Sequence, residues 1–211
     1  MLGLEPATLI TRIFTLIVAF TIHEVAHAWT AVQLGDDTPR RLGRLTLNPL
    51  AHLDPLGSLL LLFAGFGWAK PVPVNPYNLR NGPQLGLAIV AAAGPFSNLV
   101  LATLAAIPFR FDLLSSAGTR RATFFPSPAD FLAEFILLNL VLMLFNLIPI
   151  TPLDGSKILR GFAPREWDSF LAPLEQWGPF LLMALVFLGR GAFGLIIGGP
   201  AIFLYRALVG V

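Results

Sequence analysis

The residues best suited to chemistry in this 211-residue chain are two histidines and a glutamate inside an apolar segment. His23 and His27 are four residues apart, so a helix places them on one face, about 6 Å apart along its axis. Both can bind one metal ion, and Glu24 lies beside that face and can accept a proton. In this H-E-x-x-H pattern two imidazoles bind zinc and the carboxylate acts as a general base on water. The pattern predicts one Zn²⁺ per chain.

The alternative is that His23 and His27 are polar residues of a helical core, hydrogen-bonded to neighbouring helices. A single buried histidine would favour that interpretation. Here the pattern is complete, and ionisable groups at membrane depth cost several kcal/mol unless they have a role. We therefore favour a metal site.

Two imidazoles leave at least one protein ligand unassigned, because catalytic zinc sites usually have three. His52 is the only other histidine, and Asp154 directly follows a long apolar block. Asp154 could instead form an Asp-Gly turn or cap the next helix. His52 could instead contact substrate or orient a ligand. The residue types alone leave both candidates open.

The composition predicts a polytopic membrane protein. Hydrophobic residues make up 55% of the chain and charged residues only 12%, with a mean hydropathy of +0.75. In a soluble domain about a quarter of the residues are charged. The chain has no cysteine, which excludes disulfides and thiolate metal sites. The net charge is +2, with basic residues scattered at the ends of apolar blocks, which argues against nucleic-acid binding.

We expect an α-helical polytopic membrane protein with about five transmembrane helices, since a span takes roughly 20 apolar residues. The expected spans are 13–32, 85–109, 131–150, 171–188 and 192–208.

The segment between the first two spans has a different character. Block 55–69 is short and glycine-rich, and GRLTLNP (43–49) and AKPVPVNP (69–76) flank it. In both flanks apolar and polar residues alternate and prolines and asparagines interrupt the run, as is typical of short strands or turns. We expect residues 40–80 to form a small β-sheet and a short re-entrant or interfacial helix. Such backbone is tolerated at membrane depth where protein or a water-filled cavity covers it.

Three motifs in order resemble the site-2 protease family of intramembrane zinc metalloproteases. They are HEVAH in the first span, GPFSN (94–98) in the second and NLIPITPLDG (146–155) after the third. GRLTLNPLAHLDPLG and GWAKPVPVNP resemble the minimal members of this family, which lack a PDZ domain. The resemblance covers about residues 10–165.

This resemblance implies that His23, His27 and Asp154 bind zinc and that Glu24 is the catalytic base. It also implies one membrane-embedded metalloprotease domain over 1–211, with the catalytic core at about 10–165 and two further helices at about 171–208. One departure from the family pattern is Thr151, where members often have a second proline. Threonine makes the turn before Asp154 less rigid.

Counting membrane crossings bears on the fold independently: either block 55–69 does not cross, or Asp154 is not a ligand. HEVAH lies toward the end of the first span and Asp154 just past the third, so an even number of crossings must separate them. Blocks 85–109 and 131–150 supply two, provided that 55–69 does not cross. Loops 36–44 and 154–165 are rich in Lys and Arg, which favours a cytoplasmic location for both, although the connection 110–130 on the opposite face carries three arginines. We expect a multi-pass protein of the cell membrane, with the active site nearer the cytoplasmic face.

Two intramembrane asparagines are candidates for stabilising a substrate carbonyl oxygen as it becomes anionic. We favour Asn146 as the catalytic donor over Asn98, because Asn146 approaches Asp154 from the same segment. Asn98 remains a candidate for binding substrate. Either side chain could instead form an interhelical hydrogen bond.

The stretch WAKPVPVNP is a candidate for binding the substrate backbone. If it is extended, Pro71 and Pro73 share one edge and lack N–H donors. Lys70, Val72 and Val74 share the other edge, which could pair with an unwound substrate segment by β-augmentation. An ordinary proline-rich connector is the alternative.

Together these features predict an intramembrane zinc endopeptidase that hydrolyses peptide bonds in or near transmembrane helices, as in regulated intramembrane proteolysis. Its expected partners are transmembrane protein substrates and the lipid bilayer. One alternative is a metal-binding transporter or sensor without hydrolysis, which would not need Glu24. The other is an inactive family member acting as a scaffold, but no motif residue is lost.

Overall fold

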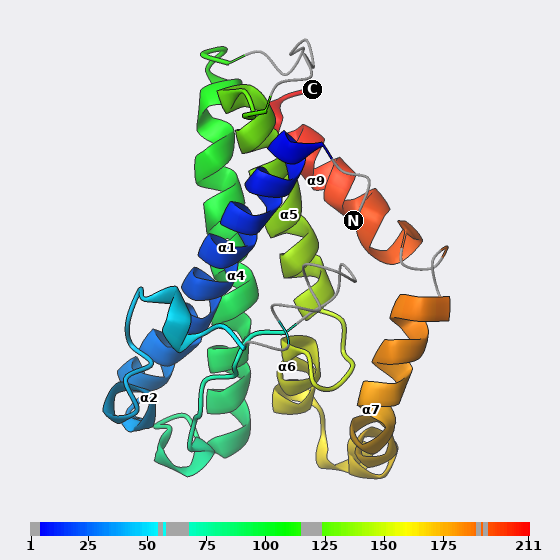
Figure 1. The fold of residues 1–211 in the computed structure, drawn as a ribbon. Coiled ribbons are helices and arrows are strands. Elements are labelled where there is room, and N and C mark those ends of the chain that lie inside the picture. The colour runs from blue at the N-terminus through cyan, green and yellow to red at the C-terminus, as the bar shows by residue number, and fades with distance from the viewer. Residues whose placement is uncertain (1–4, 55–56, 58–67, 115–123, 189–190, 192–193) are drawn as a thin grey trace.

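Three long helices form the centre of the molecule (Figure 1). They are α1 (Pro6–Gln33), α4 (Pro83–Arg110) and α5 (Pro128–Asn146), and each is long and apolar enough to cross a membrane. The computed structural model describes residues 5–54, 57, 68–114, 124–188, 191 and 194–211. Within those ranges the regular structure is helical, with seven α-helices. Helix α1 crosses in front of α4 and α5 in Figure 1, and it packs against both.

The ends of the three long helices follow from the local sequence. Each begins with a proline, whose missing N–H would have no partner in the first turn. Ser127 caps α5, since its hydroxyl accepts a hydrogen bond of 3.1 Å from the Asp130 N–H. Helix α1 is followed by Gly35 at a φ of +108°, in the left-handed region that glycine adopts without strain.

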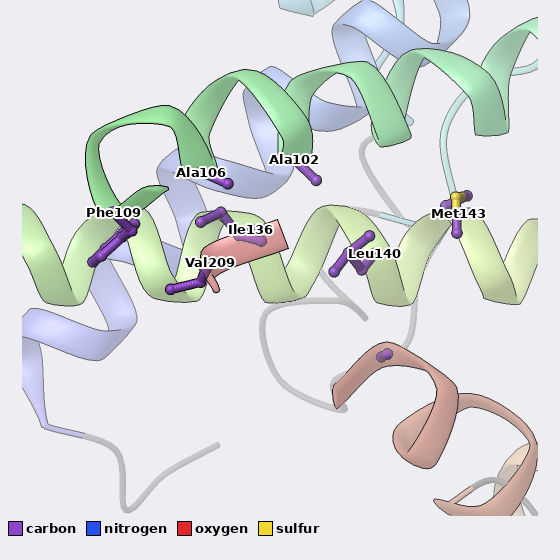
Figure 2. Close-up of a cluster of buried hydrophobic side chains, with 8 residues drawn as sticks. Ala102, Ala106, Phe109, Ile136, Leu140, Met143 and Val209 are labelled. Atoms are coloured by element: carbon purple, nitrogen blue, oxygen red, sulfur yellow. The ribbon is translucent and has the colours of Figure 1, made fainter. Parts of the chain in front are cut away.

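Helices α4 and α5 pack together around a cluster of buried hydrophobic side chains (Figure 2). Within a membrane, close packing of small residues rather than the hydrophobic effect holds helices together. Ala102 and Ala106 supply these small residues on α4, where they face α5. The cluster comprises Ala102, Ala106, Phe109, Ile136, Leu140, Met143, Ala201 and Val209.

Three further helices follow α5. They are α6 (Asp154–Phe162), α7 (Asp168–Leu188) and α9 (Gly199–Val209), the last continuing a π-helical turn, η4 (Gly194–Gly198). The helices predicted at 171–188 and 192–208 are thus largely present. The predicted number of five spans is not confirmed, because among the described residues three helices have the length and composition of a span. The apolar helix Gly194–Val209 is shorter.

The segment between α1 and α4 contains short helical turns. These are α2 (Thr38–Arg41), η1 (Pro49–Ala51) and η2 (Pro76–Asn78). The predicted small sheet is not confirmed: in the part of the segment that the structure describes, one isolated antiparallel bridge joins Leu53 to Ala69. Two prolines follow this bridge and have no N–H with which to extend a ladder. The predicted re-entrant helix falls on 55–69, of which 55–56 and 58–67 lie outside the described residues.

Candidate metal and catalytic site

The side chains of His23, His27 and Asp154 converge on one point. One ligand atom from each lies within 4.8 Å of the other two. The Nε2 atoms of His23 and His27 lie 3.1 Å and 3.2 Å from Asp154 Oδ2. All three residues are at most 7% exposed. Two imidazole nitrogens and one carboxylate oxygen match the three-ligand pattern of catalytic zinc sites, so these residues fit zinc.

Hydrogen bonds on the far side of each imidazole direct Nε2 toward the metal position. His23 Nδ1 is 2.7 Å from Asn98 Oδ1, and His27 Nδ1 is 2.7 Å from the Val90 carbonyl oxygen. Both oxygens can only accept, so each Nδ1 carries the proton and each Nε2 has a free lone pair. This is the tautomer that allows a histidine to bind zinc through Nε2.

Asn98 is itself held by two successive buried hydrogen bonds between side-chain amides and the backbone, called the amide relay. Its Nδ2 donates to Asn139 Oδ1 at 3.0 Å, and Asn139 Nδ2 donates to the Phe135 carbonyl at 2.9 Å. Asn98 and Asn139 are both 0% exposed. These hydrogen bonds therefore connect His23 of α1, through Asn98 of α4, to the backbone of α5.

Gly94 lets α4 approach the histidines closely. A Cβ atom at this position would lie 2.5 Å from His23 Nε2 and 2.5 Å from His27 Nε2, so no side chain fits. Glycine at this position therefore permits close packing of α4 against α1. Both imidazoles thus pack directly against Gly94.

Asp154 is placed by the turn between α5 and α6. It is the first residue of α6, and Gly155 packs tightly against the turn, since a Cβ there would lie 2.3 Å from the Leu147 carbonyl oxygen. The Thr151–Pro152 peptide bond in this turn is cis. Burial opposes ionisation of Asp154, but His27 and His23 lower its pKa well below the usual range, so the carboxylate is charged at neutral pH.

A cavity of about 610 Å³ opens onto the three ligand residues. Glu24 lines it, and the buried Glu24 Oε2 atom has no hydrogen-bond partner among the described residues. An unpaired carboxylate oxygen beside a metal site can accept a proton from water. Pro71, Val72 and Val74 line the cavity as well.

The two asparagines predicted to face substrate differ in position. Asn146 lines the cavity, and its Nδ2 donates to the Leu142 carbonyl at 3.0 Å. Asn98 does not line the cavity. Its side-chain oxygen and nitrogen both form hydrogen bonds with other side chains. The structure therefore gives Asn98 a contact with His23 where the sequence suggested one with substrate.

Only part of the segment predicted to bind the substrate backbone has backbone N–H groups that are unpaired among the described residues. Lys70 departs from the prediction: its N–H donates to the His52 carbonyl at 2.7 Å, and its own carbonyl accepts from Arg44. No described residue pairs with the N–H groups of Val72 or Val74. The edge with free donors therefore begins at Val72.

His52 lies apart from the three converging ligands. It is fully buried, and its Nε2 donates to the Thr46 carbonyl at 2.8 Å. Its backbone carbonyl accepts from Lys70, as above. Of the two candidates for the third ligand, Asp154 is the one that the structure brings to the histidines.

Sequence reasoning missed three residues of this region. Lys157 lines the cavity, with its Nζ 3.5 Å from Asp154 Oδ1. Asn139 completes the relay behind His23, and Arg44 holds the Lys70 carbonyl. The spacing of Lys157, three residues after Asp154 at the start of a helix, was a usable signal, as was the second asparagine within the third span.

Two curated proteins similar to this chain are named for zinc and proteolysis. The chain is 43% identical over 182 residues to the "putative zinc metalloprotease YwhC" of Bacillus subtilis, which covers 86% of this chain and 82% of that protein. It is 33% identical over 187 residues to the "putative zinc metalloprotease Rip2" of Mycolicibacterium smegmatis, covering 82% and 67%. No family model matches the chain, and no solved structure matches it significantly.

Proposed function

Given that this chain belongs to the zinc metalloprotease family of these relatives, we propose that it is an intramembrane endopeptidase of the site-2 protease type. Its substrates are membrane proteins, cut in or near a transmembrane helix. The observation that supports this most directly is the location of His23, Glu24 and His27 inside α1, a helix with the length and composition of a membrane span. The third ligand residue, Asp154, meets them from α6.

The residues divide the work of hydrolysis between them. His23, His27 and Asp154 would hold the zinc ion, which when bound supplies a Lewis acid that lowers the pKa of water and polarises the scissile carbonyl. Glu24 accepts a proton from the attacking water and delivers it to the leaving amine. Asn146 lines the same cavity and can donate to the carbonyl oxygen as it becomes anionic.

Substrate binding requires unwinding, because a transmembrane helix pairs its own N–H and C=O groups. Freed groups in a dry site are costly unless they find new partners. The free backbone groups at Val72 and Val74 support a role in receiving an extended substrate segment, as a short added strand. Lysines and arginines of the segments 36–44 and 154–165 favour a cytoplasmic position for this end of the bundle.

The proposal is tested with purified protein reconstituted in vesicles with single-pass membrane proteins. The intact chain should cleave one or more of them within or near the span. Glu24→Gln should bind zinc normally and lose cleavage, because an amide cannot take the proton. Zinc binding without cleavage by the intact chain would instead indicate a transporter or sensor.

A further inference from the structure

A buried arginine joins the two loop segments beside the cavity. Arg44 is 5% exposed. Its Nη1 donates to the Ala51 carbonyl, and its Nη2 donates to the carbonyls of Lys70 and Pro71, the latter at 2.8 Å. One guanidinium thus binds three carbonyl oxygens from two segments that are far apart in sequence.

Arginine is suited to this position for a physical reason. A buried charge is costly unless it is paired or hydrogen-bonded, and a guanidinium carries five donors in a rigid plane. A lysine ammonium has three donors on a flexible stem and cannot span two segments in the same way. The Lys70 N–H bond to His52 and the Leu53–Ala69 bridge reinforce the same junction.

The other end of this segment is also held by a buried charge. Asp36 is 0% exposed, and its Oδ2 accepts a hydrogen bond of 2.7 Å from the Asn75 N–H. Its Oδ1 accepts from Asn78 Nδ2 at 3.0 Å. Residues 70–74, called the cavity edge below, are therefore fixed at one end by Arg44 and at the other by Asp36. Val72 and Val74 lie between these two points and line the cavity.

Arg44 also interacts electrostatically with Glu24, the residue proposed as the general base. Burial lowers the pKa of the Arg44 guanidinium, and the negative charge of Glu24 acts in the opposite direction. The guanidinium therefore lies within electrostatic range of Glu24. The cavity edge and Glu24 face the same cavity, so a shift of this edge changes its distance from the base.

We propose that Arg44 is a positioning residue that holds the cavity edge against Glu24, so that an extended substrate segment pairing with this edge meets the catalytic site in register. This inference rests on the proposed function, because it assigns Arg44 to substrate placement in that reaction. It also assigns a purpose to the GRLTLNP and AKPVPVNP stretches, which meet at this guanidinium.

The test compares Arg44→Gln and Arg44→Lys with Arg41→Gln, which removes the same charge from an exposed position three residues earlier. Each full-length variant is reconstituted with a cleaved membrane substrate. Arg44→Gln should keep its zinc and raise KM about tenfold, with a smaller change in kcat, because the edge contacts substrate before and during the reaction. Arg44→Lys should raise KM less, and Arg41→Gln should match the intact protein. An unchanged KM in Arg44→Gln overturns the proposal. If Arg44→Gln does not fold, an unchanged KM in Arg44→Lys overturns it equally.

Hydrogen exchange gives a result that does not depend on cleavage. The Lys70 amide, bonded to His52, should lose protection in Arg44→Gln, whereas the Asn75 amide, bonded to Asp36, should keep it. Unchanged protection of Lys70 in this variant overturns the proposal even if the intact chain cleaves no substrate. Absence of cleavage by the intact chain, with Lys70 protection lost in the variant, overturns the proposed function and leaves Arg44 as the residue that holds the edge.

Discussion

His23 donates a hydrogen bond of 2.7 Å from Nδ1 to Asn98 Oδ1, and this bond determines which ring nitrogen faces Asp154. Because Nδ1 carries the proton, Nε2 keeps its lone pair for a metal ion. A residue predicted to touch substrate is thus in contact with a candidate metal ligand. The first prediction follows from this contact.

Asn98→Ala should weaken zinc binding about 10- to 100-fold, as is typical when a hydrogen-bond partner of a metal-binding histidine is removed. Competition with a chelator measures the affinity. Asn98→Asp keeps an acceptor for Nδ1 and should lose less. Thr103→Ala, at an exposed position of the same helix, is the control. Native zinc affinity in Asn98→Ala would show that the bond does not orient His23.

Gly94→Ala should abolish zinc binding and activity. The added methyl group would lie 2.5 Å from both Nε2 atoms, so the imidazoles or the whole of α4 must move. Metal analysis of the purified variant measures the loss. Gly198→Ala is a matched control, because a Cβ there has no atom within 4 Å. Full zinc content in Gly94→Ala would contradict the close packing of α4 against the histidines.

Asp154→Ala should release most of the zinc, whereas His52→Ala should retain most of it. Asp154 Oδ2 lies beside both imidazoles, while His52 Nε2 is bonded to the Thr46 carbonyl. Metal content per chain measures both effects. The reverse pattern, with zinc lost from the His52 variant and kept by the Asp154 variant, would refute the assigned ligand set.

Val72→Pro should reduce cleavage of a full-length membrane substrate at least about tenfold, because it removes a central N–H donor from the cavity edge. Zinc content and folding should stay normal. Val72→Ala shortens the side chain but keeps the N–H, so it separates loss of the donor from loss of side-chain contacts. Equal cleavage by the proline variant and the intact protein would exclude backbone pairing at this residue.

Asp36 should stabilise the fold in a pH-dependent way. Burial opposes its ionisation, but hydrogen bonds from Thr38, Asn78 and the Asn75 backbone bring its pKa below the ordinary value of 3.8. A carboxyl whose pKa is lower when folded stabilises the protein above its ordinary pKa, and this contribution is lost as the pH falls through the folded value. Asp36→Asn should therefore unfold more easily than the intact chain at pH 7.

The difference between Asp36→Asn and the intact chain should shrink below about pH 4, where the carboxyl protonates more readily in the unfolded chain. Thermal unfolding in detergent between pH 3 and pH 7 measures it. Asp37→Asn is the control, because the Asp37 side chain is half-exposed and its ion pair with Arg40 contributes little. A stability difference that does not change with pH would contradict the role of the Asp36 charge.

The parts of this protein that the sequence determined are those set by short-range periodicity. His23 and His27 must share a helix face because they are four residues apart, whatever surrounds them. The long apolar runs likewise predicted α1, α4 and α5, since hydropathy over about 20 residues is a local property. Motif resemblance and the count of crossings indicated Asp154, although it lies 131 residues from His23.

Tertiary structure alone decided which polar groups are already occupied. In the sequence, Asn98 and Asn146 are both candidates for donating a hydrogen bond to substrate. Only the packing shows that Asn98 is buried and bonded to His23, while Asn146 lines the cavity. Lys70 and Val72 belong to one alternating stretch, yet Lys70 pairs with His52 and Arg44. A hydrogen bond depends on the partner that arrives from elsewhere in the chain, and no local pattern records which partner that is.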